Sequence, residues 1–595
     1  MSTYRDRLAA LRRTLAENRY DGFVVPLTDE HMSEYVGSYA QRLAWLTGFE
    51  GSAGSAVVLS REAGIFVDGR YTLQVRDQVD GTLYQYLGVP KVQIADWLEE
   101  KVAPGQRIGF DPWLHTRGWV EATGKRLAAK GAELVPVPEN PVDRVWTDRP
   151  APSAERFEAH DEELAGRSSA EKRAEIARWL GEKKADCVVI AALDSIAWLF
   201  NVRGRDVSRT PVALAFAIVS ADGKAQLFSA PAKITPEVAA HLGPDVAILP
   251  PEAFVEALTA LGKAGKTVAA DPATCVAAIF QALEVGGACI VEARDPCILA
   301  KAIKNPIEIA GAKAAHVRDG AALSRFLGWF DREAPKGTLD EITVAEKLED
   351  FRRESNLLKD LSFDTISGAG PNGAIVHYRV SPETNRKVEQ DSIFLLDSGG
   401  QYLDGTTDVT RTMIVGTPSA EMKDRFTRVL KGHIALATAR FPAGTRGSQL
   451  DVLARQFLWQ AGLDYAHGTG HGVGSFLSVH EGPQRIATFG GGDEPLAAGM
   501  IVSNEPGYYK TGEYGIRIEN LVLVVPVEVE GAEQSLLGFE TLTLAPIDLR
   551  LVDIGLLGDE ERAWLNAYHA RVRETLTPIV PEDVRGWLAE ATRAI

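Results

Sequence analysis

Short apolar runs alternate with amphipathic segments through the first part of the chain. The arginine- and leucine-rich stretch that ends near Asn18 has the spacing of an amphipathic helix, and the apolar run DGFVVP (residues 21–26) follows it. The segments SAVVLS and GIFVDGR are rich in β-forming residues and are bounded by glycine. This alternation predicts an α/β domain over residues 1–150.

The same pattern returns further along the chain. ADCVVIAALDSIAWLFNVRG (residues 185–204) resembles DGFVV followed by RLAWLTGFEG, and both copies contain the triplet Ala-Trp-Leu. A β-rich segment with an Asp-Gly turn follows each copy, at residues 68–69 and 222–223. These features predict a duplicated α/β domain over residues 151–305, behind a polar linker that contains proline. Chance similarity between apolar triplets is the alternative.

Longer helices and a different strand pattern mark residues 306–595. Asn305 can cap a helix that has Pro306 at its first position, and further helices are predicted to begin at Thr343 and at Ser448. Extended segments such as SIFLLDSG and MIVSNEP lie between them. The third block is therefore predicted to be an α+β domain.

Length and composition restrict the class of protein. A chain of 595 residues exceeds one hydrophobic core and should form several domains. The net charge of −17 disfavours binding to nucleic acid or to an anionic membrane surface. The 4 cysteines form no C-x-x-C pair, and the N-terminus has no apolar signal region. We therefore expect a cytoplasmic protein.

Two aspartates of the third block follow apolar strand residues. Asp397 ends the run SIFLLD, and Asp408 comes eleven residues later. An odd separation within one continuous strand would place the two side chains on opposite faces, so a shared site requires the chain to bend between them. Three glycines between the two aspartates permit that bend: Gly399, Gly400 and Gly405. The alternative is that either aspartate serves only as a turn or cap residue.

Two glutamates of the third block also lie at strand ends or within strands. Glu505 ends MIVSNE just before a proline. In the strand GIRIENLVLVV, Arg517 and Glu519 are expected to share one face, with Ile516 and Ile518 on the other. If Glu519 is buried in this apolar strand, its carboxylate needs a partner. The alternative is that Arg517 and Glu519 form a pair on a solvent-exposed face.

The segment HGTGHGVG carries two histidines four residues apart, His467 and His471. Its glycines make a helix unfavourable, so we expect a loop that directs the two imidazoles separately.

These residues together have the chemistry of a metal site. Four carboxylates in one buried place repel each other, and two divalent cations would balance their charge. Oxygen-rich ligation with one imidazole suits Mn²⁺, although Co²⁺, Fe²⁺ or Zn²⁺ could also bind.

Several motifs carry a specific resemblance. GAIVHY, LLDSGGQYLDGTTDVTRT, HGTGHGVG, VHEGP, SNEPGYY and GIRIEN resemble the Xaa-Pro aminopeptidases of the pita-bread metallopeptidase family M24. FEGSAGSAVV, VDGRYTLQ and the duplicated N-terminal halves are similar to the long, three-domain form of that family. The resemblance implies two creatinase-like α/β domains followed by a pita-bread α+β catalytic domain with a C-terminal extension.

The resemblance also implies roles for individual residues. The implied metal ligands are Asp397, Asp408, His471, Glu505 and Glu519. The implied catalytic residues are His377, His467, His480 and Glu505. The implied substrate-binding residues are Arg70, Arg517 and the same three histidines.

The implied activity is removal of the first residue from peptides that have proline in second position. Two metal ions sharing a water lower its pKa and supply a hydroxide nucleophile. A homodimer is expected from the family. The alternatives are an Xaa-Pro dipeptidase, which in this family resembles a shorter two-domain form, and a pita-bread scaffold that binds proteins without catalysis.

Overall fold

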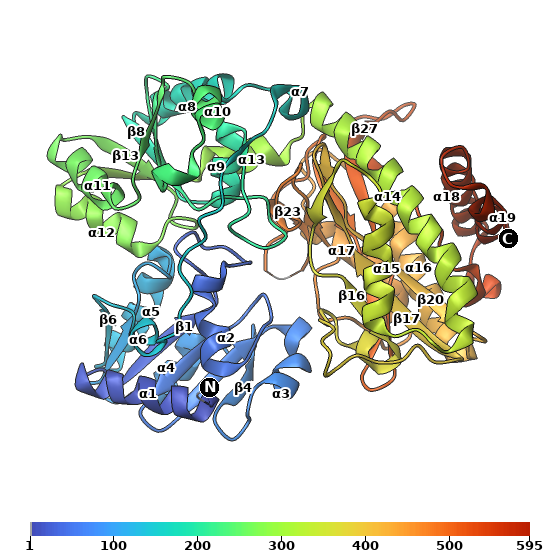
Figure 1. Cartoon of the computed structure of the whole chain (residues 1–595), viewed down its shortest axis with the longest axis horizontal. Coiled ribbons are helices and arrows are strands. Elements are labelled where there is room, and N and C mark those ends of the chain that lie inside the picture. The colour runs from blue at the N-terminus through green and yellow to red at the C-terminus, as the bar shows by residue number, and fades with distance from the viewer. Residues whose placement is uncertain (1–2, 489) are drawn as a thin grey trace. The chain divides into compact units, whose positions relative to one another are not determined.

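The structure is a computed structural model that describes residues 3–488 and 490–595 (Figure 1). The chain forms two compact units. The first unit contains the residues up to Glu162 together with Arg167–Ile298, and the second contains Glu163–Gly166 and Leu299–Ile595. The predicted domain limits at residues 150 and 305 stay predictions.

The first unit contains two six-stranded sheets with helices between their strands. The strands of the first sheet are β1 (Gly22–Pro26), β2 (Ser55–Leu59), β3 (Ala63–Val67), β4 (Gln85–Gly88), β5 (Arg107–Phe110) and β6 (Glu133–Pro136). The helices around it are α1 (Tyr4–Glu17), α2 (Arg42–Thr47), α3 (Gln74–Gln78), α4 (Ile94–Lys101), α5 (Arg117–Ala129) and α6 (Pro141–Val145).

The second sheet repeats the plan of the first. Its strands are β8 (Cys187–Ile190), β10 (Phe216–Ser220), β11 (Ala225–Phe228), β12 (Val246–Leu249), β13 (Thr267–Ala270) and β14 (Cys289–Glu292). Its helices are α8 (Ser169–Lys183), α9 (Leu193–Phe200), α10 (Pro236–Leu242), α11 (Ala253–Lys263) and α12 (Ala277–Gly286). The strand orders are β4-β3-β2-β1-β5-β6 and β12-β11-β10-β8-β13-β14.

The strand directions repeat as well, which confirms the predicted pair of related α/β domains. Strand β1 is antiparallel to β2 and parallel to β5, and β8 is antiparallel to β10 and parallel to β13. The Asp-Gly turns occupy different places in the two copies. Residues 222–223 form the turn between β10 and β11, whereas residues 68–69 follow β3.

The second unit combines long helices with antiparallel sheets, in agreement with the predicted α+β class. Its principal helices are α14 (Pro306–Glu333), α15 (Glu341–Arg353), α16 (Ala420–Ala437), α17 (Gly447–Trp459), α18 (Asp559–Leu576) and α19 (Glu582–Ala591). One small sheet has the order β16-β17-β20, from β16 (Ile366–Ala369), β17 (Ser392–Ser398) and β20 (Val409–Val415). A second has the order β15-β18-β19, from β15 (Leu358–Leu361), β18 (Gly400–Tyr402) and β19 (Gly405–Thr406).

The largest sheet of this unit has the order β21-β28-β27-β24-β22-β23. Its strands are β21 (Phe441–Pro442), β22 (Gly470–Gly472), β23 (Glu481–Ile486), β24 (Ile501–Asn504), β27 (Asn520–Val527) and β28 (Leu536–Thr541). A hairpin of β25 (Gly507–Lys510) and β26 (Tyr514–Arg517) lies between β24 and β27 in the chain.

Two of the three predicted helix starts in this unit were displaced. Asn305 caps α14 as expected, accepting hydrogen bonds from the amides of the first turn. The cap of helix α15 lies three residues earlier than predicted, because Asp340 accepts the hydrogen bond from the Thr343 amide and the helix begins at Glu341. Helix α17 begins at Gly447, so Ser448 lies inside its first turn.

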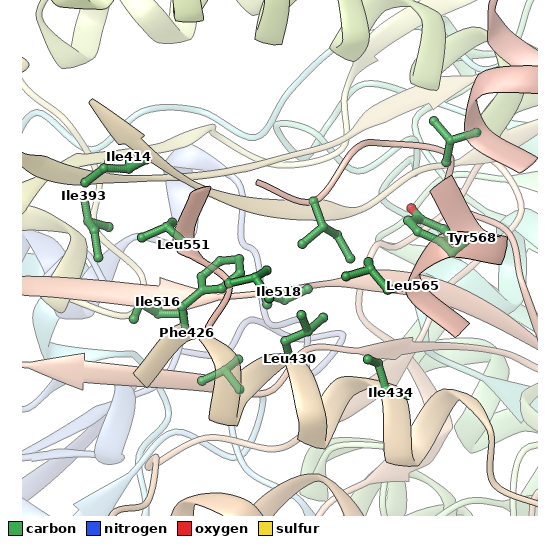
Figure 2. Close-up of a cluster of buried hydrophobic side chains, with 14 of the residues drawn as sticks. Ile393, Ile414, Phe426, Leu430, Ile434, Ile516, Ile518, Leu551, Leu565 and Tyr568 are labelled. Atoms are coloured by element: carbon green, nitrogen blue, oxygen red, sulfur yellow. The ribbon is translucent and has the colours of Figure 1, made fainter. Parts of the chain in front are cut away.

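Helix α16 and the C-terminal helices close the main core of this unit. Phe426, Leu430 and Ile434 recur at helical spacing on α16 and are at most 3% exposed. They pack with side chains from the strands and with Leu565 and Tyr568 of α18 (Figure 2). Burial of this apolar face fixes α16 and α18 beside the strands that carry the candidate site. Among the described residues, no helix is long and apolar enough to cross a membrane.

Candidate metal centre

Asp397 and Asp408 come together through the antiparallel pair of β17 and β20. Asp397 lies opposite Thr410, and Asp408 directly precedes β20. Because side chains alternate along a strand, Asp408 and Thr410 face the same side as Asp397. The chain turns back between the two aspartates, as predicted. Gly399 is needed there for close approach, since a Cβ atom would lie 2.0 Å from the Thr407 carbonyl oxygen.

Glu505 and Glu519 come together at the end of another antiparallel pair. Asn504 of β24 lies opposite Asn520 of β27. Glu505 follows the first asparagine and Glu519 precedes the second, so both side chains leave the same end of the paired strands. The single strand predicted over GIRIENLVLVV is interrupted at residues 518–519, which lie between β26 and β27.

The predicted division of that segment into two faces nevertheless holds. Ile516 and Ile518 belong to the buried apolar cluster of α16 and α18. Arg517 and Glu519 are each 1% exposed and lie on the polar side, so the alternative of a solvent-exposed pair was wrong.

His471 lies in a strand and not in the loop that its glycine neighbours predicted. It is the central residue of β22. A Cβ atom at Gly470 would lie 2.1 Å from the Ser503 carbonyl oxygen, and one at Gly472 would lie 2.2 Å from that of Glu481. These glycines therefore allow neighbouring strands to approach, and they hold His471 between β23 and β24. His467 lies before the strand, so the two imidazoles are directed separately, as expected.

One acidic cluster gathers around the His471 ring. Its Nε2 atom lies 3.4 Å from Oδ2 of Asp408 and 3.7 Å from Oε1 of Glu505. Asp408, His471 and Glu519 each direct one possible ligand atom into a space where these atoms lie within 4.8 Å of one another. The Nδ1 atom of His471 lies 2.9 Å from the Gly472 carbonyl oxygen and donates to it. Nε2 therefore faces the carboxylates, and loss of its proton exposes the lone pair that binds a metal.

Asp397 joins this cluster through an arginine. The Nη2 atom of Arg517 donates a 2.7 Å hydrogen bond to Oδ2 of Asp397, while Nε donates to the Thr410 hydroxyl at 3.0 Å. Thr410 in turn donates to Oε2 of Glu519 at 2.7 Å. The Oδ1 atom of Asp397 is buried and has no hydrogen-bond partner among the described residues. A buried carboxylate oxygen without a hydrogen-bond partner is suited to bind a metal ion.

Thr410 and Tyr509 were missed by the sequence reasoning. The Tyr509 hydroxyl accepts a 2.6 Å hydrogen bond from Nη1 of Arg517 and lies 2.9 Å from Nε2 of His467. Their positions in the sequence could have identified them. Thr410 lies two residues after Asp408, and Tyr509 follows Glu505 in the motif NEPGYY.

The carboxylates oppose each other's ionisation. Burial, opposed by Arg517 and assisted by the charge of Asp408, raises the pKa of Asp397 to about 7. Burial and the neighbouring carboxylates also raise the pKa values of Glu505 and Glu519. Burial lowers the pKa of His471, but Asp408 and Glu505 outweigh it and raise that pKa to about 9. The cluster therefore lacks positive charge, which two divalent cations would supply.

The three predicted non-ligand histidines occupy different positions around the cluster. The His480 ring centroid lies 4.4 Å from that of His471. Nδ1 of His467 lies 4.0 Å from Oε2 of Glu505. His377 lies in a turn, directly after Val376. The Val376 carbonyl oxygen accepts a 3.4 Å hydrogen bond from Nη1 of Arg517. His467 and His480 thus lie beside residues of the cluster, and His377 follows a residue that is bonded to Arg517.

The two predicted substrate-binding arginines have partners within the chain. Arg70 lies in the first unit, where Nη2 donates a 2.7 Å hydrogen bond to Asp68 and Nη1 lies 4.0 Å from Glu34. Arg517 is bound to Asp397, Thr410 and Tyr509, so its observed contacts orient the acidic cluster. Contact of either arginine with a substrate stays a prediction.

Family models match the chain in four segments. Residues 310–526 match metallopeptidase family M24, and residues 535–595 match the C-terminal region of peptidase M24. Residues 7–145 and 148–308 each match a creatinase/prolidase N-terminal domain.

Similar proteins cover the whole chain. A probable Xaa-Pro aminopeptidase P from Neosartorya fischeri is 44% identical over 99% of this chain and 92% of its own length. Its counterpart from Aspergillus niger is 43% identical over 99% of this chain and 98% of its own length. The X-prolyl aminopeptidase from Caenorhabditis elegans, described as a cytosolic enzyme with a di-nuclear active site, has a TM-score of 0.96 and 38% identity, covering 100% of both chains.

Proposed function

Because the chain belongs to metallopeptidase family M24, we propose that it is a metal-dependent Xaa-Pro aminopeptidase. It removes the first residue from peptides that carry proline in second position. The observation that carries this proposal is the whole-length likeness to proteins of that name, in a chain where Asp408, His471 and Glu519 direct possible ligand atoms into one space beside Glu505.

We infer a dinuclear centre held by all four carboxylates and one imidazole. Asp397, Asp408, His471, Glu505 and Glu519 would together hold the two ions. Mn²⁺ is the proposed metal, because oxygen ligands dominate the set. When bound, the two ions would act as Lewis acids toward a water molecule and toward the scissile carbonyl group.

The side chains around the cluster supply proton transfer and orientation. Glu505 accepts the proton of the attacking water and passes it toward the leaving nitrogen. His377 and His480 donate hydrogen bonds to the carbonyl oxygen as negative charge develops on it. His467 shapes the side of the site that receives proline, supported by its contact with Tyr509. Arg517 holds Asp397 in its ligating orientation.

Proline in second position suits such a site because its nitrogen carries no proton and its ring fixes the backbone. Arg70 is proposed to contact the substrate from the first unit. A homodimer and a cytosolic location are also proposed. The expected homodimer of the family supports the first, and the C. elegans enzyme, described as cytosolic, supports the second.

Two peptides of different length test the proposal. The purified full-length protein with Mn²⁺ should give a higher kcat/KM for Ala-Pro-Pro than for the dipeptide Ala-Pro. Preference for the dipeptide would assign the protein as a dipeptidase. Full activity in the presence of excess chelator would overturn the metal mechanism, and no hydrolysis of either peptide by the metal-loaded protein would overturn the proposed activity.

A further inference from the structure

A buried polar network lies behind the two candidate glutamate ligands. Asn504 and Asn520, which adjoin Glu505 and Glu519, are both 0% exposed. His433 of α16 joins them: its Nδ1 atom lies 3.1 Å from the Asn504 carbonyl oxygen, and its Nε2 atom lies 3.1 Å from Nδ2 of Asn520. The Asn504 amide also donates to the His433 carbonyl oxygen at 2.9 Å. The strand ends that carry both glutamates are therefore bound to one helix.

Arg411 is the centre of this network. It lies in β20 and is 2% exposed. Its Nη1 atom donates to the Glu519 carbonyl oxygen at 2.6 Å, and Nη2 donates to Oδ1 of Asn520 at 2.8 Å. Glu519 is thus held at its backbone by Arg411 and at its carboxylate by Thr410, the residue before Arg411.

The other contacts of Arg411 reach the C-terminal part of the chain. Nε donates to the Pro546 carbonyl oxygen at 2.9 Å, and Nη2 donates to the Ala545 carbonyl oxygen and to the Tyr568 hydroxyl, both at 2.9 Å. All these partners are neutral. A guanidinium group can reach this many acceptors because its five N–H groups diverge in one plane, and the two N–H groups of Nη2 are shared among three acceptors. A lysine ammonium cannot reproduce this arrangement.

Tyr568 connects the arginine to helix α18. Its ring lies in the apolar core beside Leu565, as Figure 2 shows, and the residue is 5% exposed. Its hydroxyl accepts from Nη2 of Arg411 and from the Ala545 amide, at 2.9 and 3.2 Å. The position of α18 therefore determines where one side of the Arg411 guanidinium group is held.

We propose that Arg411, anchored by Tyr568, is a positioning residue for the metal centre, and that the affinity for metal depends on the contact between Arg411 and Tyr568 of helix α18. This inference rests on the proposed ligand set. Glu519 lies between two strands, and its amide donates to the Thr410 carbonyl oxygen at 3.2 Å. Arg411 holds the other backbone group, the Glu519 carbonyl oxygen, so its loss allows the carboxylate to move away from its ligating position.

Manganese affinity tests this inference independently of peptide hydrolysis. The full-length protein is stripped of metal, and the Kd for Mn²⁺ is measured by isothermal titration calorimetry, with the spectrum of bound Mn²⁺ recorded by electron paramagnetic resonance. Outer residues that orient ligands typically contribute about 10- to 100-fold in affinity, so Arg411→Lys should raise the Kd by about that factor. Tyr568→Phe should raise it by a smaller factor.

Lys431→Met provides the matched control. Lys431 of α16 donates hydrogen bonds to Glu561 and to the Leu556 carbonyl oxygen, so it ties α16 to the start of α18 without contacting Arg411. This variant should lower the melting temperature while the Kd for Mn²⁺ stays at the wild-type value.

The outcomes separate positioning from simple structural support. A wild-type Kd in folded Arg411→Lys protein would overturn the inference, and if that variant does not fold, a wild-type Kd in Tyr568→Phe would do so. An equal rise in Kd in Lys431→Met would also overturn it. Failure of the wild-type protein to bind Mn²⁺ would overturn the ligand set itself, whereas inactivity toward Xaa-Pro peptides with normal Mn²⁺ binding would overturn only the proposed activity.

Discussion

Arg517 and Asp397 form a buried ion pair, with 2.7 Å between Nη2 and Oδ2, at the edge of the acidic cluster. The same guanidinium group donates to Thr410 and to Tyr509, so three nitrogens of one side chain bind three groups of the site. The pair explains how a carboxylate whose pKa is raised by burial is still held toward the other acidic residues. It also gives Arg517 a role in orienting the cluster.

Replacing Arg517 by lysine should separate charge from geometry. The Arg517→Lys variant keeps the positive charge, but one ammonium group cannot reach Asp397, Thr410 and Tyr509 together. Misplacement of a reacting group by about 1 Å can cost roughly 100-fold, so we expect a loss of about that size in kcat/KM for an Xaa-Pro-Pro peptide. Tyr509→Phe, which removes one of the three contacts, is the control and should lose less. Near-normal kcat/KM in Arg517→Lys would show that charge alone is required.

Glu505→Ala should abolish turnover. Glu505 lies 3.7 Å from Nε2 of His471 and is the proposed proton carrier. The variant should still bind metal through the four other ligands, with reduced affinity, and saturating Mn²⁺ should not restore kcat. Steady-state kinetics across a range of Mn²⁺ concentrations check this expectation. Recovery of kcat at high Mn²⁺ would mean that Glu505 acts only as a ligand.

Removal of metal should destabilise the second unit. The raised pKa values of Asp397, Glu505 and Glu519 show that the carboxylates cannot all ionise without added positive charge. A ligand that binds only the folded state at 100 times its Kd stabilises by about 2.7 kcal/mol, so dialysis against chelator should lower the melting temperature and Mn²⁺ should restore it. Calorimetry measures both transitions. An unchanged melting temperature would contradict a buried, charge-balanced cluster.

Much of the fold was predictable from local patterns. The repeated α/β domains follow from alternating apolar runs and repeated motifs, and the strands that lead to Asp397 and Glu505 follow from apolar runs that end in an acidic residue. The run around Glu519 was predicted as one strand, but it is divided at that residue. Helix starts were less certain because neighbouring polar residues compete as caps, as Asp340 and Thr343 show.

The parts of the site that could not be predicted depend on close approach between distant segments. The glycines beside His471 indicated a loop, yet they accommodate the carbonyl oxygens of Ser503 and Glu481. Arg411 and Tyr568 are separated by 157 residues, and neither lies in a motif that signals contact between them. Periodicity reports which face of an element is buried, and it does not report which polar group lies opposite.

Glu341 should control the loop that carries His377. It is 0% exposed, and its carboxylate accepts hydrogen bonds from the Ala369 amide, from Asn372 and from the Tyr378 hydroxyl. An amide in its place would direct N–H groups at these donors, so Glu341→Gln should displace the loop and lower kcat by roughly 100-fold.

The affinity for Mn²⁺ distinguishes this effect from damage to the metal cluster. It should be unchanged in Glu341→Gln, since the carboxylate contacts none of the five proposed ligands. Tyr378→Phe removes one of the donors and should have a smaller effect in the same direction. If Glu341 acts through His377, the double variant His377→Ala/Glu341→Gln should lose no more kcat than His377→Ala alone. Additive losses of kcat would show that the two residues act independently.

Acid should destabilise the protein in part through His569. This residue is 0% exposed, and its Nε2 atom accepts a 3.0 Å hydrogen bond from the Ile547 amide, which a protonated ring cannot do. Burial, together with the charge of Arg411 and two other arginines, lowers its pKa to about 3. The unfolded chain binds this proton near its ordinary pKa of about 6.5. The stabilisation is therefore complete above that pH and is lost progressively as pH falls from about 6.5 toward 3.

His569→Gln should remove that pH dependence, because the glutamine carbonyl oxygen can accept from the Ile547 amide and does not titrate in this range. Between pH 7.5 and pH 5 the wild-type protein should lose about 2 kcal/mol of stability from this residue, and the variant should lose that much less. Urea unfolding at both pH values, with Mn²⁺ saturating, gives the two differences. Other buried histidines and the metal ligands titrate in both proteins and cancel in the comparison. An equal loss in wild type and variant would show that His569 is protonated in the folded protein or is not the group responsible.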